Sequence, residues 1–371
     1  MSAAKTNKIY FQNLDSLRAI AALAVVGFHC INGLHFPDEP KYDWIGKIIS
    51  FNGQGGPLGV AFFFILSGFL ITYLLFQEKK EVGKVNVGHF YLRRLLRIWP
   101  LYYLTLLIGF VLYPMVMNYM GHGYEEVASG WMFSTFLANF DHIRMQGSPA
   151  VGILGVQWSL SVEEQFYLFW PLLFFIKMKP KGYFWSFVIL LVGSEIFYWS
   201  QDNHYVQYYH LLSNLRFLAM GAILAYLAYA HQEKLTRALS KIPFETKGLL
   251  YIIGIMYLFI GNEWKDMQVF HLLNHFVPLF FFSFVIMDQC YAKDPLFPLG
   301  RFKALTEIGK ISYGVYLLHM IVLFALKNLV GEQDPFYLRV VATFVLTIIS
   351  AYFIYHYFEK PFLKWKDKFK A

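Results

Sequence analysis

Arg18 and His29 are ionisable residues inside the first long apolar segment of the chain, 14–31. A helix rises 1.5 Å per residue with 3.6 residues per turn, so their separation is about three turns and ~16 Å, with both side chains on one face. An arginine or a histidine within a membrane helix is costly unless it faces the protein interior or a wet cavity. This helix face is therefore the first candidate for a functional site.

Two adjacent carboxylates, Glu163 and Glu164, lie near the start of another apolar segment, 158–176. Neighbouring residues of a helix point about 100° apart, so at least one of the two must face the helix bundle. A buried carboxylate needs a partner, and the candidates are Arg18, Arg216 and His29. The alternative interpretation is a pair of interfacial acids that face the water outside the membrane.

Three arginines, Arg93, Arg94 and Arg97, precede a third apolar segment. Their spacings of three and four residues allow all three to project from one side of a helix that enters the membrane. Guanidinium groups bind phosphates with paired hydrogen bonds, so such a cluster at the cytoplasmic surface suits a phosphorylated ligand. The alternative is a belt of basic side chains that reach the lipid headgroups and bind no specific ligand.

Two further motifs favour packing roles. Ser67 and Gly68 form a small pair within the second apolar segment, which is typical of a close helix crossing. Ser312, Tyr316 and His319 share one face of a later helix, where a histidine among aromatic residues indicates a hydrogen-bonded packing element.

Composition places these residues in an all-α, polytopic transmembrane bundle. The chain of 371 residues is 57% hydrophobic and only 15% charged, with a mean hydropathy of +0.44, which is too apolar for a soluble protein of this size. Neither a separate soluble domain nor an internal repeat is evident, so residues 1–371 are predicted to form a single domain. About ten segments have the length and apolarity of a span: 14–31, 58–76, 98–117, 158–176, 184–200, 211–230, 248–261, 272–289, 311–330 and 338–357.

The distribution of basic residues predicts the orientation of the bundle. Most of the 32 lysines and arginines fall in alternate connections that include both ends of the chain, so the positive-inside rule assigns both termini to the cytoplasm, as short tails 1–13 and 358–371. Pro361 is expected to end the last span. The net charge of +8 then marks loops beside an anionic leaflet, not a nucleic-acid binder. The histidines lack the clustered spacing of a metal site.

Six motifs in collinear order resemble the acyltransferase-3 family of multi-pass membrane acyltransferases. They are LDSLR at 14–18 with His29, LSGFLI at 66–71, RRLLRIWP at 93–100, WSLSVEEQFY at 158–167, SYGVYLLH at 312–319 and EKPF at 359–362. The resemblance covers nearly the whole chain. It is closest to the stand-alone form of the family, because the extra hydrolase-like domain of some members does not follow the last span.

The resemblance implies a membrane O-acyltransferase of the bacterial cytoplasmic (inner) membrane. Such a protein moves an acyl group, most often acetyl from acetyl-CoA, to a hydroxyl group of a carbohydrate or glycolipid. The expected partners are thus membrane lipid, acyl-CoA as co-substrate and the acceptor, without a metal, and a homo-oligomer is an open possibility.

Roles for individual residues follow from this expectation. His29 is the candidate general base, or the carrier of the acyl group if donor and acceptor never meet. Glu163, with Glu164 as second choice, could orient its imidazole, while Arg18 could hold a carboxylate or a donor phosphate and Asp15 could hold Arg18. The residues expected to bind acyl-CoA are Arg93, Arg94, Arg97, Tyr102 and Ser67.

Two other protein classes also bury charged residues in a helix bundle. A secondary transporter usually shows repeated halves with broken helices at matching positions, which this sequence lacks. A non-enzymatic binding or sensor module would leave the three-arginine cluster without a ligand. Release of free CoA from labelled acetyl-CoA distinguishes the enzyme from both alternatives.

Overall fold

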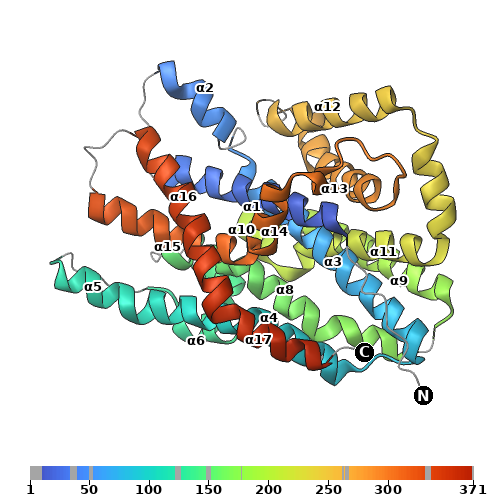
Figure 1. Cartoon of the computed structure of the whole chain (residues 1–371), viewed down its shortest axis with the longest axis horizontal. Helices are drawn as coiled ribbons and strands as arrows, with labels where there is room; N and C mark the ends of the chain where they lie inside the picture. Colours follow the sequence, from blue (N-terminus) through green and yellow to red (C-terminus); the bar gives the residue numbers. More distant parts are fainter. Residues whose placement is uncertain are drawn as a thin grey trace.

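The computed structural model describes residues 11–33, 40–49, 53–121, 127–147, 152–176, 178–260, 263, 267–330 and 336–369. Helices make up the architecture, and several of them are long enough to cross a membrane (Figure 1). Many of their large apolar side chains are exposed, for example those of Ile189, Ile252 and Val341, as expected where lipid replaces water around a bundle. The predicted all-α polytopic bundle is confirmed.

The helices follow one another along the whole chain. They are α1 (Gln12–Gly33), α2 (Pro40–Ile49), α3 (Gly55–Val82), α4 (Val87–Leu107), a π-helical turn (Ile108–Leu112), α5 (Tyr113–Tyr119), α6 (Gly130–Ser134), α7 (Ala138–Arg144), α8 (Gln157–Phe169), a 3₁₀ segment (Trp170–Phe175), α9 (Pro180–Trp199), α10 (His204–Tyr209), α11 (Leu211–Ser240), α12 (Phe244–Ile260), α13 (Gln268–Tyr291), α14 (Lys303–Lys310), α15 (Ser312–Val330), α16 (Phe336–Ile354), a second π-helical turn (Tyr355–Glu359) and α17 (Lys360–Lys366).

The described helices that are long and apolar enough to cross a membrane are fewer than the ten spans predicted from the sequence. Seven of the described helices have the length and hydropathy of a membrane span. The count is eight if α14 and α15, which meet at a bend of 75°, together form one broken span. Two predicted spans fall short. The segment 158–176 changes from α-helix to 3₁₀-helix at Trp170, next to Pro171, which lacks an N–H donor, and α12 has 17 residues. The count of about ten spans and the cytoplasmic termini stay predictions.

The last long helix does not end at Pro361, contrary to expectation. After α16 the chain makes the π-helical turn Tyr355–Glu359 and continues into α17, where Pro361 occupies the first turn. A proline in the first turn removes no helical hydrogen bond, because the N–H groups there have no partner within the helix. The proline therefore marks a joint between two helical segments.

Helix α3 lies at the centre of the packing, with α1 and α11 both against it. A Cβ added at Gly68 would lie 2.0 Å from the Leu218 carbonyl oxygen, and one at Gly221 would lie 2.1 Å from the Ile65 carbonyl oxygen. The backbones of α3 and α11 therefore touch, which only residues without a side chain allow. The predicted packing role of the Ser67–Gly68 pair is confirmed for Gly68.

The turn between α3 and α4 is built by two capping residues. Gly83 ends α3 with a φ of +78° and donates its N–H to the Lys79 carbonyl oxygen, a conformation that favours glycine. Asn86 begins α4 by accepting the His89 N–H. This short connection brings the three-arginine cluster on α4 beside the end of α3.

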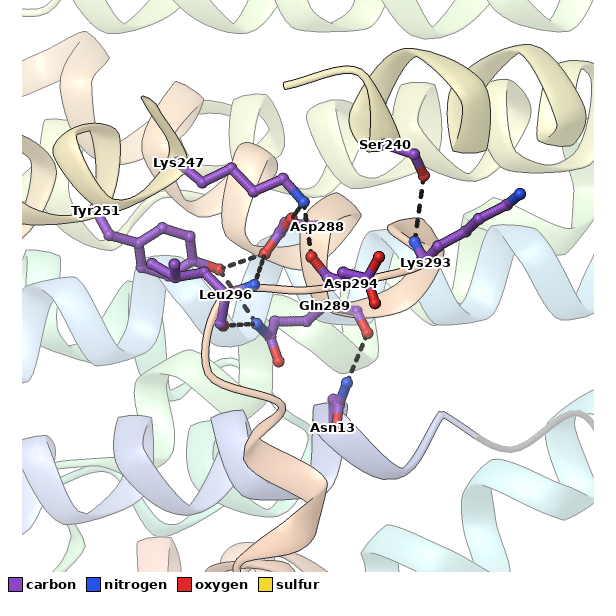
Figure 2. Close-up of polar contacts among 9 residues, drawn as sticks. All are labelled: Asn13, Ser240, Lys247, Tyr251, Asp288, Gln289, Lys293, Asp294 and Leu296. Carbon is purple, nitrogen blue, oxygen red and sulfur yellow. Dashed lines mark hydrogen bonds and ion pairs between the residues drawn. The ribbon is translucent and has the colours of Figure 1, made fainter. Parts of the chain in front are cut away.

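A buried polar network holds the chain segment that precedes α14 (Figure 2). Lys247 on α12 pairs with Asp288 on α13 at 2.8 Å, and the second oxygen of Asp288 accepts the Leu296 N–H at 3.0 Å. On the other side, Asn13 donates to the Gln289 carbonyl oxygen at 2.9 Å. The network therefore ties α12, α13 and the following segment to the start of α1.

Helix α14 then packs directly on α1 beside the candidate site. A Cβ at Gly309 would lie 1.8 Å from the Asp15 carbonyl oxygen, and Ser16 Oγ lies 3.1 Å from Thr306 Oγ1. Asp15 and Arg18 thus stand on a helix turn whose position depends on the polar network of Figure 2.

Candidate active site

A cavity of about 750 Å³ extends from the turn between α3 and α4 into the bundle. Its wall comes from α1, α3, α4, α8, α14, α15, the π-helical turn before α17 and α17 itself. Eight of the residues selected from the sequence line it: Asp15, Arg18, Ser67, Arg93, Arg94, Arg97, Glu163 and Glu164. Segments far apart in the chain thus meet around one space of the size that small-molecule sites have.

Within the three-arginine cluster, Arg93 is occupied by protein partners. Its guanidinium contacts Glu78 Oε2 at 2.8 Å and donates to the Phe369 carbonyl oxygen at 2.8 Å. These contacts join the end of α3, the start of α4 and the end of the last helix. Arg93 therefore holds this part of the cavity wall together, a role that sequence spacing could not distinguish from ligand binding.

Arg94 and Arg97 also line the cavity, but their guanidinium groups make no hydrogen bond or ion pair with any described residue. Arg94 lies between the rings of Phe90 and Tyr167, each 5.8 Å from its guanidinium carbon, and its Nε is buried without a partner. Carboxylates of the cavity wall interact with these cations electrostatically, Glu164 with Arg94 and Glu359 with Arg97. None of them accepts a hydrogen bond from either guanidinium among the described residues, so N–H donors are left for a ligand. These two residues are thus the cations best suited to an anionic ligand.

Glu163 forms a closed hydrogen-bonded group with two hydroxyls. Its two oxygens accept Ser67 Oγ at 2.6 Å and the Tyr167 hydroxyl at 3.0 Å, and Tyr167 also donates to Ser67 Oγ at 3.2 Å. The group joins α3 to α8 at the wall of the cavity. Ser67 is therefore more than a small packing residue, since it holds the carboxylate in place.

Glu164 takes a different partner on a different helix. Its Oε2 accepts the indole N–H of Trp99 at 3.0 Å, and its Oε1 is buried without a partner. The partners expected for the two acids were wrong. Among the described contacts, Arg18 pairs with Asp15 at 2.9 Å, and the other candidates, Arg216 and His29, hydrogen-bond to histidines.

His29 faces a second histidine that the sequence interpretation assigned to packing. His319 Nε2 lies 3.2 Å from His29 Nδ1, and His319 Nδ1 lies 2.6 Å from the Tyr316 carbonyl oxygen. Since a carbonyl oxygen only accepts, His319 carries its proton on Nδ1 and offers Nε2 as an acceptor. His29 Nδ1 also lies 3.0 Å from the Val25 carbonyl oxygen, so its proton is on Nδ1 and its Nε2 keeps a free lone pair.

The imidazole pair adjoins the inner end of the cavity through one turn of α15. Tyr316 lines the cavity, its ring lies 5.9 Å from that of His319, and its hydroxyl lies 2.7 Å from Ser159 Oγ. The ring of Phe63 meets that of Tyr316 edge-on at 6.0 Å. His29 is not itself among the lining residues, and it is linked to the cavity wall through His319 and Tyr316.

Tyr102, a predicted donor-binding residue, lies away from this space. Its side chain is fully buried, its hydroxyl donates to the Phe133 carbonyl oxygen at 2.7 Å, and its ring stacks on Phe136 with centroids 4.3 Å apart. These contacts anchor the segment of α6 and α7 to α4. The Tyr102 hydroxyl is thus bonded to the protein backbone, away from the cavity.

Two further cavity residues, Glu359 and Tyr313, lie in motifs that the sequence analysis did not assign to the site. Glu359 belongs to the motif at 359–362, yet it is only 7% exposed, lines the cavity and has a buried oxygen without a partner. The π-helical turn places it there, a feature that often occurs at functional sites. Tyr313, in the motif at 312–319, lines the cavity and donates to the Ile98 carbonyl oxygen at 2.7 Å.

Comparison with protein-family models adds an independent observation. Residues 11–356 match the model described as an acyltransferase domain, Acyl_transf_3. The chain belongs to the acyltransferase-3 family. The match extends from the start of α1 into the π-helical turn Tyr355–Glu359, so it includes every cavity residue discussed above except Glu359.

Two relatives from Staphylococcus aureus bear names consistent with this family. O-acetyltransferase OatA of strain NCTC 8325 / PS 47 is 28% identical over 96% of this chain and 57% of its own length. A protein of strain COL that is provisionally named an O-acetyltransferase is 29% identical over 96% of this chain and 58% of its own length. The chain thus spans less than three fifths of these relatives. No solved structure matches it.

The comparisons confirm the predicted family. They also agree with a multi-pass membrane protein. The predicted roles of individual residues and the single domain over 1–371 stay predictions.

Proposed function

We propose that this acyltransferase transfers an acetyl group from acetyl-CoA to a hydroxyl group of a carbohydrate or glycolipid at the bacterial cytoplasmic membrane. The observation that carries the proposal is the pair of unpartnered guanidiniums of Arg94 and Arg97 in a cavity whose inner end adjoins the His29–His319 pair. Anion-binding groups and a candidate base thus occur along one path. The names of the relatives, O-acetyltransferases, support acetyl as the acyl group.

The chemistry of the cavity supports a CoA thioester as the donor. Phosphates need cations with free donors, which Arg94 and Arg97 supply, while Arg93 keeps the mouth in shape through Glu78. The remaining wall includes apolar residues such as Phe63, Leu70 and Leu160, against which an uncharged arm can lie. Arg18, paired with Asp15, adds a further cation along the same wall.

In this proposal His29 acts as a general base through Nε2. It takes the proton of the acceptor hydroxyl as the new C–O bond forms, and the thioester C–S bond breaks to give a CoA thiolate. The same imidazole then returns the proton to the thiolate, so an alcohol and acetyl-CoA become an acetyl ester and free CoA. His319 Nε2 accepts a hydrogen bond from the His29 Nδ1–H throughout, and this bond holds the ring orientation.

A decisive experiment uses the purified chain in lipid nanodiscs with [¹⁴C]acetyl-CoA and a membrane extract of glycolipid and polysaccharide acceptors. The expected result is release of free CoA together with alkali-labile label in the carbohydrate fraction. Movement of a solute across proteoliposomes without CoA release would identify a transporter, and neither activity would identify a binding module. A label on the protein that is lost in acid or in neutral hydroxylamine, and that chases into acceptor, would show the acyl-histidine route.

A further inference from the structure

A second cavity, of about 210 Å³, lies at the opposite end of α3 from the mouth of the first. Leu58 lines it near the start of α3, whereas Glu78 lines the first cavity near the end of that helix. Twenty residues of α-helix span about 30 Å, which is the thickness of a bilayer core. Val60 lines both cavities, so the two spaces approach each other from opposite ends of the bundle.

Aromatic side chains form one side of this second cavity. Trp158 and Tyr208 have ring centroids 5.1 Å apart, and His204 stacks on Tyr208 at 6.3 Å. They come from α8 and α10, and all three line the space. Flat aromatic faces beside a few polar groups are typical of sites for small ligands that combine apolar and polar surface.

A buried charged group forms the other side. Arg216 Nη1 lies 2.8 Å from His275 Nδ1 and 2.5 Å from His275 Nε2, and the same Nε2 lies 2.6 Å from Glu195 Oε2. The imidazole thus lies against both the guanidinium and the carboxylate, and Glu195 offsets the positive charge of Arg216. Arg216 is only 8% exposed, yet its Nε is buried without a partner. The Arg216 guanidinium thus offers a hydrogen-bond donor in the wall, and because Glu195 offsets its charge the site does not favour an anion.

Two amides complete the polar lining. Asn214 uses its NH₂ group on the Tyr208 and His210 carbonyl oxygens, and Gln207 uses its NH₂ group on the Tyr198 and Gln201 carbonyl oxygens. Their oxygens remain as acceptors, because each amide carries both functions. The cavity thus combines donors, acceptors and aromatic faces in a neutral environment.

We infer that this second cavity binds one sugar ring of the acceptor, at a unit other than the one that is acetylated. A sugar ring is uncharged, offers hydroxyls that both donate and accept, and has an apolar face of C–H groups that packs on aromatic rings. The inference rests on the proposed function, since it assigns the acceptor side of the same reaction. Binding energy from such a remote unit positions the reacting hydroxyl.

The location of the cavity relative to His29 fits an acceptor with several units. The ring of Phe28, next to His29 on α1, approaches α3 at Gly56, and Leu58 faces the second cavity two residues further on. His29 and the cavity are therefore at the same level of the bundle, on two sides of α3. The diameter of one helix with its side chains, about 10 Å, separates them.

The experiment uses the full chain in detergent micelles on an array of neutral and phosphorylated oligosaccharides, followed by titration calorimetry with the strongest binder. The variants are Tyr208→Leu, which removes the aromatic face, and the double variant R216Q/E195Q, which removes the guanidinium while keeping the group neutral. Tyr119→Leu is the matched control, because Tyr119 is 94% exposed and lines neither cavity. Binding of acetyl-CoA is titrated on the same samples.

The expected result is saturable binding of neutral oligosaccharides that weakens at least tenfold in both cavity variants and stays unchanged in the control, with the Kd for acetyl-CoA constant throughout. Absence of binding to any neutral glycan, preference for phosphorylated ones, or binding that survives both variants would overturn the inference. Failure of the proposed function gives a different result: the protein without substitutions would neither bind acetyl-CoA nor release CoA from it.

Discussion

His319 Nε2 lies 3.2 Å from His29 Nδ1, which joins two histidines 290 residues apart in the chain. The Tyr316 carbonyl oxygen determines the tautomer of His319, and His319 together with the Val25 carbonyl oxygen determines that of His29. A neutral imidazole has one donor and one acceptor nitrogen, so the proton on His319 Nδ1 leaves Nε2 to accept a hydrogen bond from His29 Nδ1. The relationship makes His319 a positioning residue for the proposed base.

Replacement of His29 should remove the chemical step. We expect His29→Gln to lower kcat by about 10² to 10⁴, the usual contribution of a general base, with little change in acetyl-CoA binding. Steady-state CoA release and titration calorimetry measure the two quantities. Normal turnover in this variant would exclude His29 from the mechanism.

Replacement of His319 should act through His29. We expect His319→Ala to lower kcat by roughly 10- to 100-fold and to leave the donor KM unchanged, by analogy with other residues that orient a functional histidine. His319→Asn should recover part of this loss, since the amide oxygen can accept the His29 Nδ1 proton. A purely structural role predicts the same loss in both variants, together with lowered thermal stability.

The three arginines of the cluster should separate into two classes. Arg94→Gln and Arg97→Gln should each raise the KM for acetyl-CoA about 10- to 100-fold, because a hydrogen bond to a charged group contributes about 1.5–3 kcal/mol. Arg93→Gln should chiefly lower stability, since Arg93 already pairs with Glu78. Arg301→Gln, at an exposed position outside the cavity, is the control. Equal KM effects at all three cluster positions would contradict this division.

Lys247 should be essential to the network of Figure 2. Asp288 is fully buried, so Lys247→Met leaves its charge without a counter-ion, which should lower the free energy of unfolding by about 3–5 kcal/mol. The double variant K247M/D288N should regain part of the loss. Lys293→Met changes an exposed lysine near the same segment and is the control. Unfolding in mixed micelles measures the differences, and equal stability of the K247M and K293M variants would refute the prediction.

The contact between α3 and α11 should not tolerate a methyl group. Gly68→Ala would place a Cβ 2.0 Å from a backbone oxygen, so the helices must separate, at a cost of about 1–3 kcal/mol or more. Gly193→Ala on α9 has no atom within 4 Å of the new Cβ, and it should stabilise the protein by about 0.5–1 kcal/mol. Thermal unfolding of the two variants should therefore shift in opposite directions, and a parallel shift would contradict the contact.

Much of the candidate site was recognisable from short patterns. Arg18, Ser67, Glu163 and the arginines of α4 were selected from their types and spacings, and all line one cavity. The ionisable residues among them reach the cavity because a charged side chain in an apolar helix must face the protein interior, whatever its partners are, while their roles stay predictions. The helical class of the fold followed from the same apolar periodicity.

Partners across helices were not accessible in this way. The spacing of Arg93, Arg94 and Arg97 makes them equivalent on one helix, and only the approach of Glu78 on α3 distinguishes Arg93 from the other two. His319 was interpreted as a packing residue because His29, its neighbour in space, is 290 positions away. The turn at Tyr355–Glu359 that directs Glu359 inward likewise has no local sequence signal.

Local chemistry along the chain was thus sufficient to establish a helical membrane protein, the faces of its helices and the residues with catalytic potential, because burial of apolar surface and exclusion of charge from lipid act on each helix separately. Which charges are paired, which tautomer His29 adopts and where two cavities lie along α3 depended on the packing of helices against one another. Those properties arise from contacts at a few ångströms between distant segments, and no single helix contains that information.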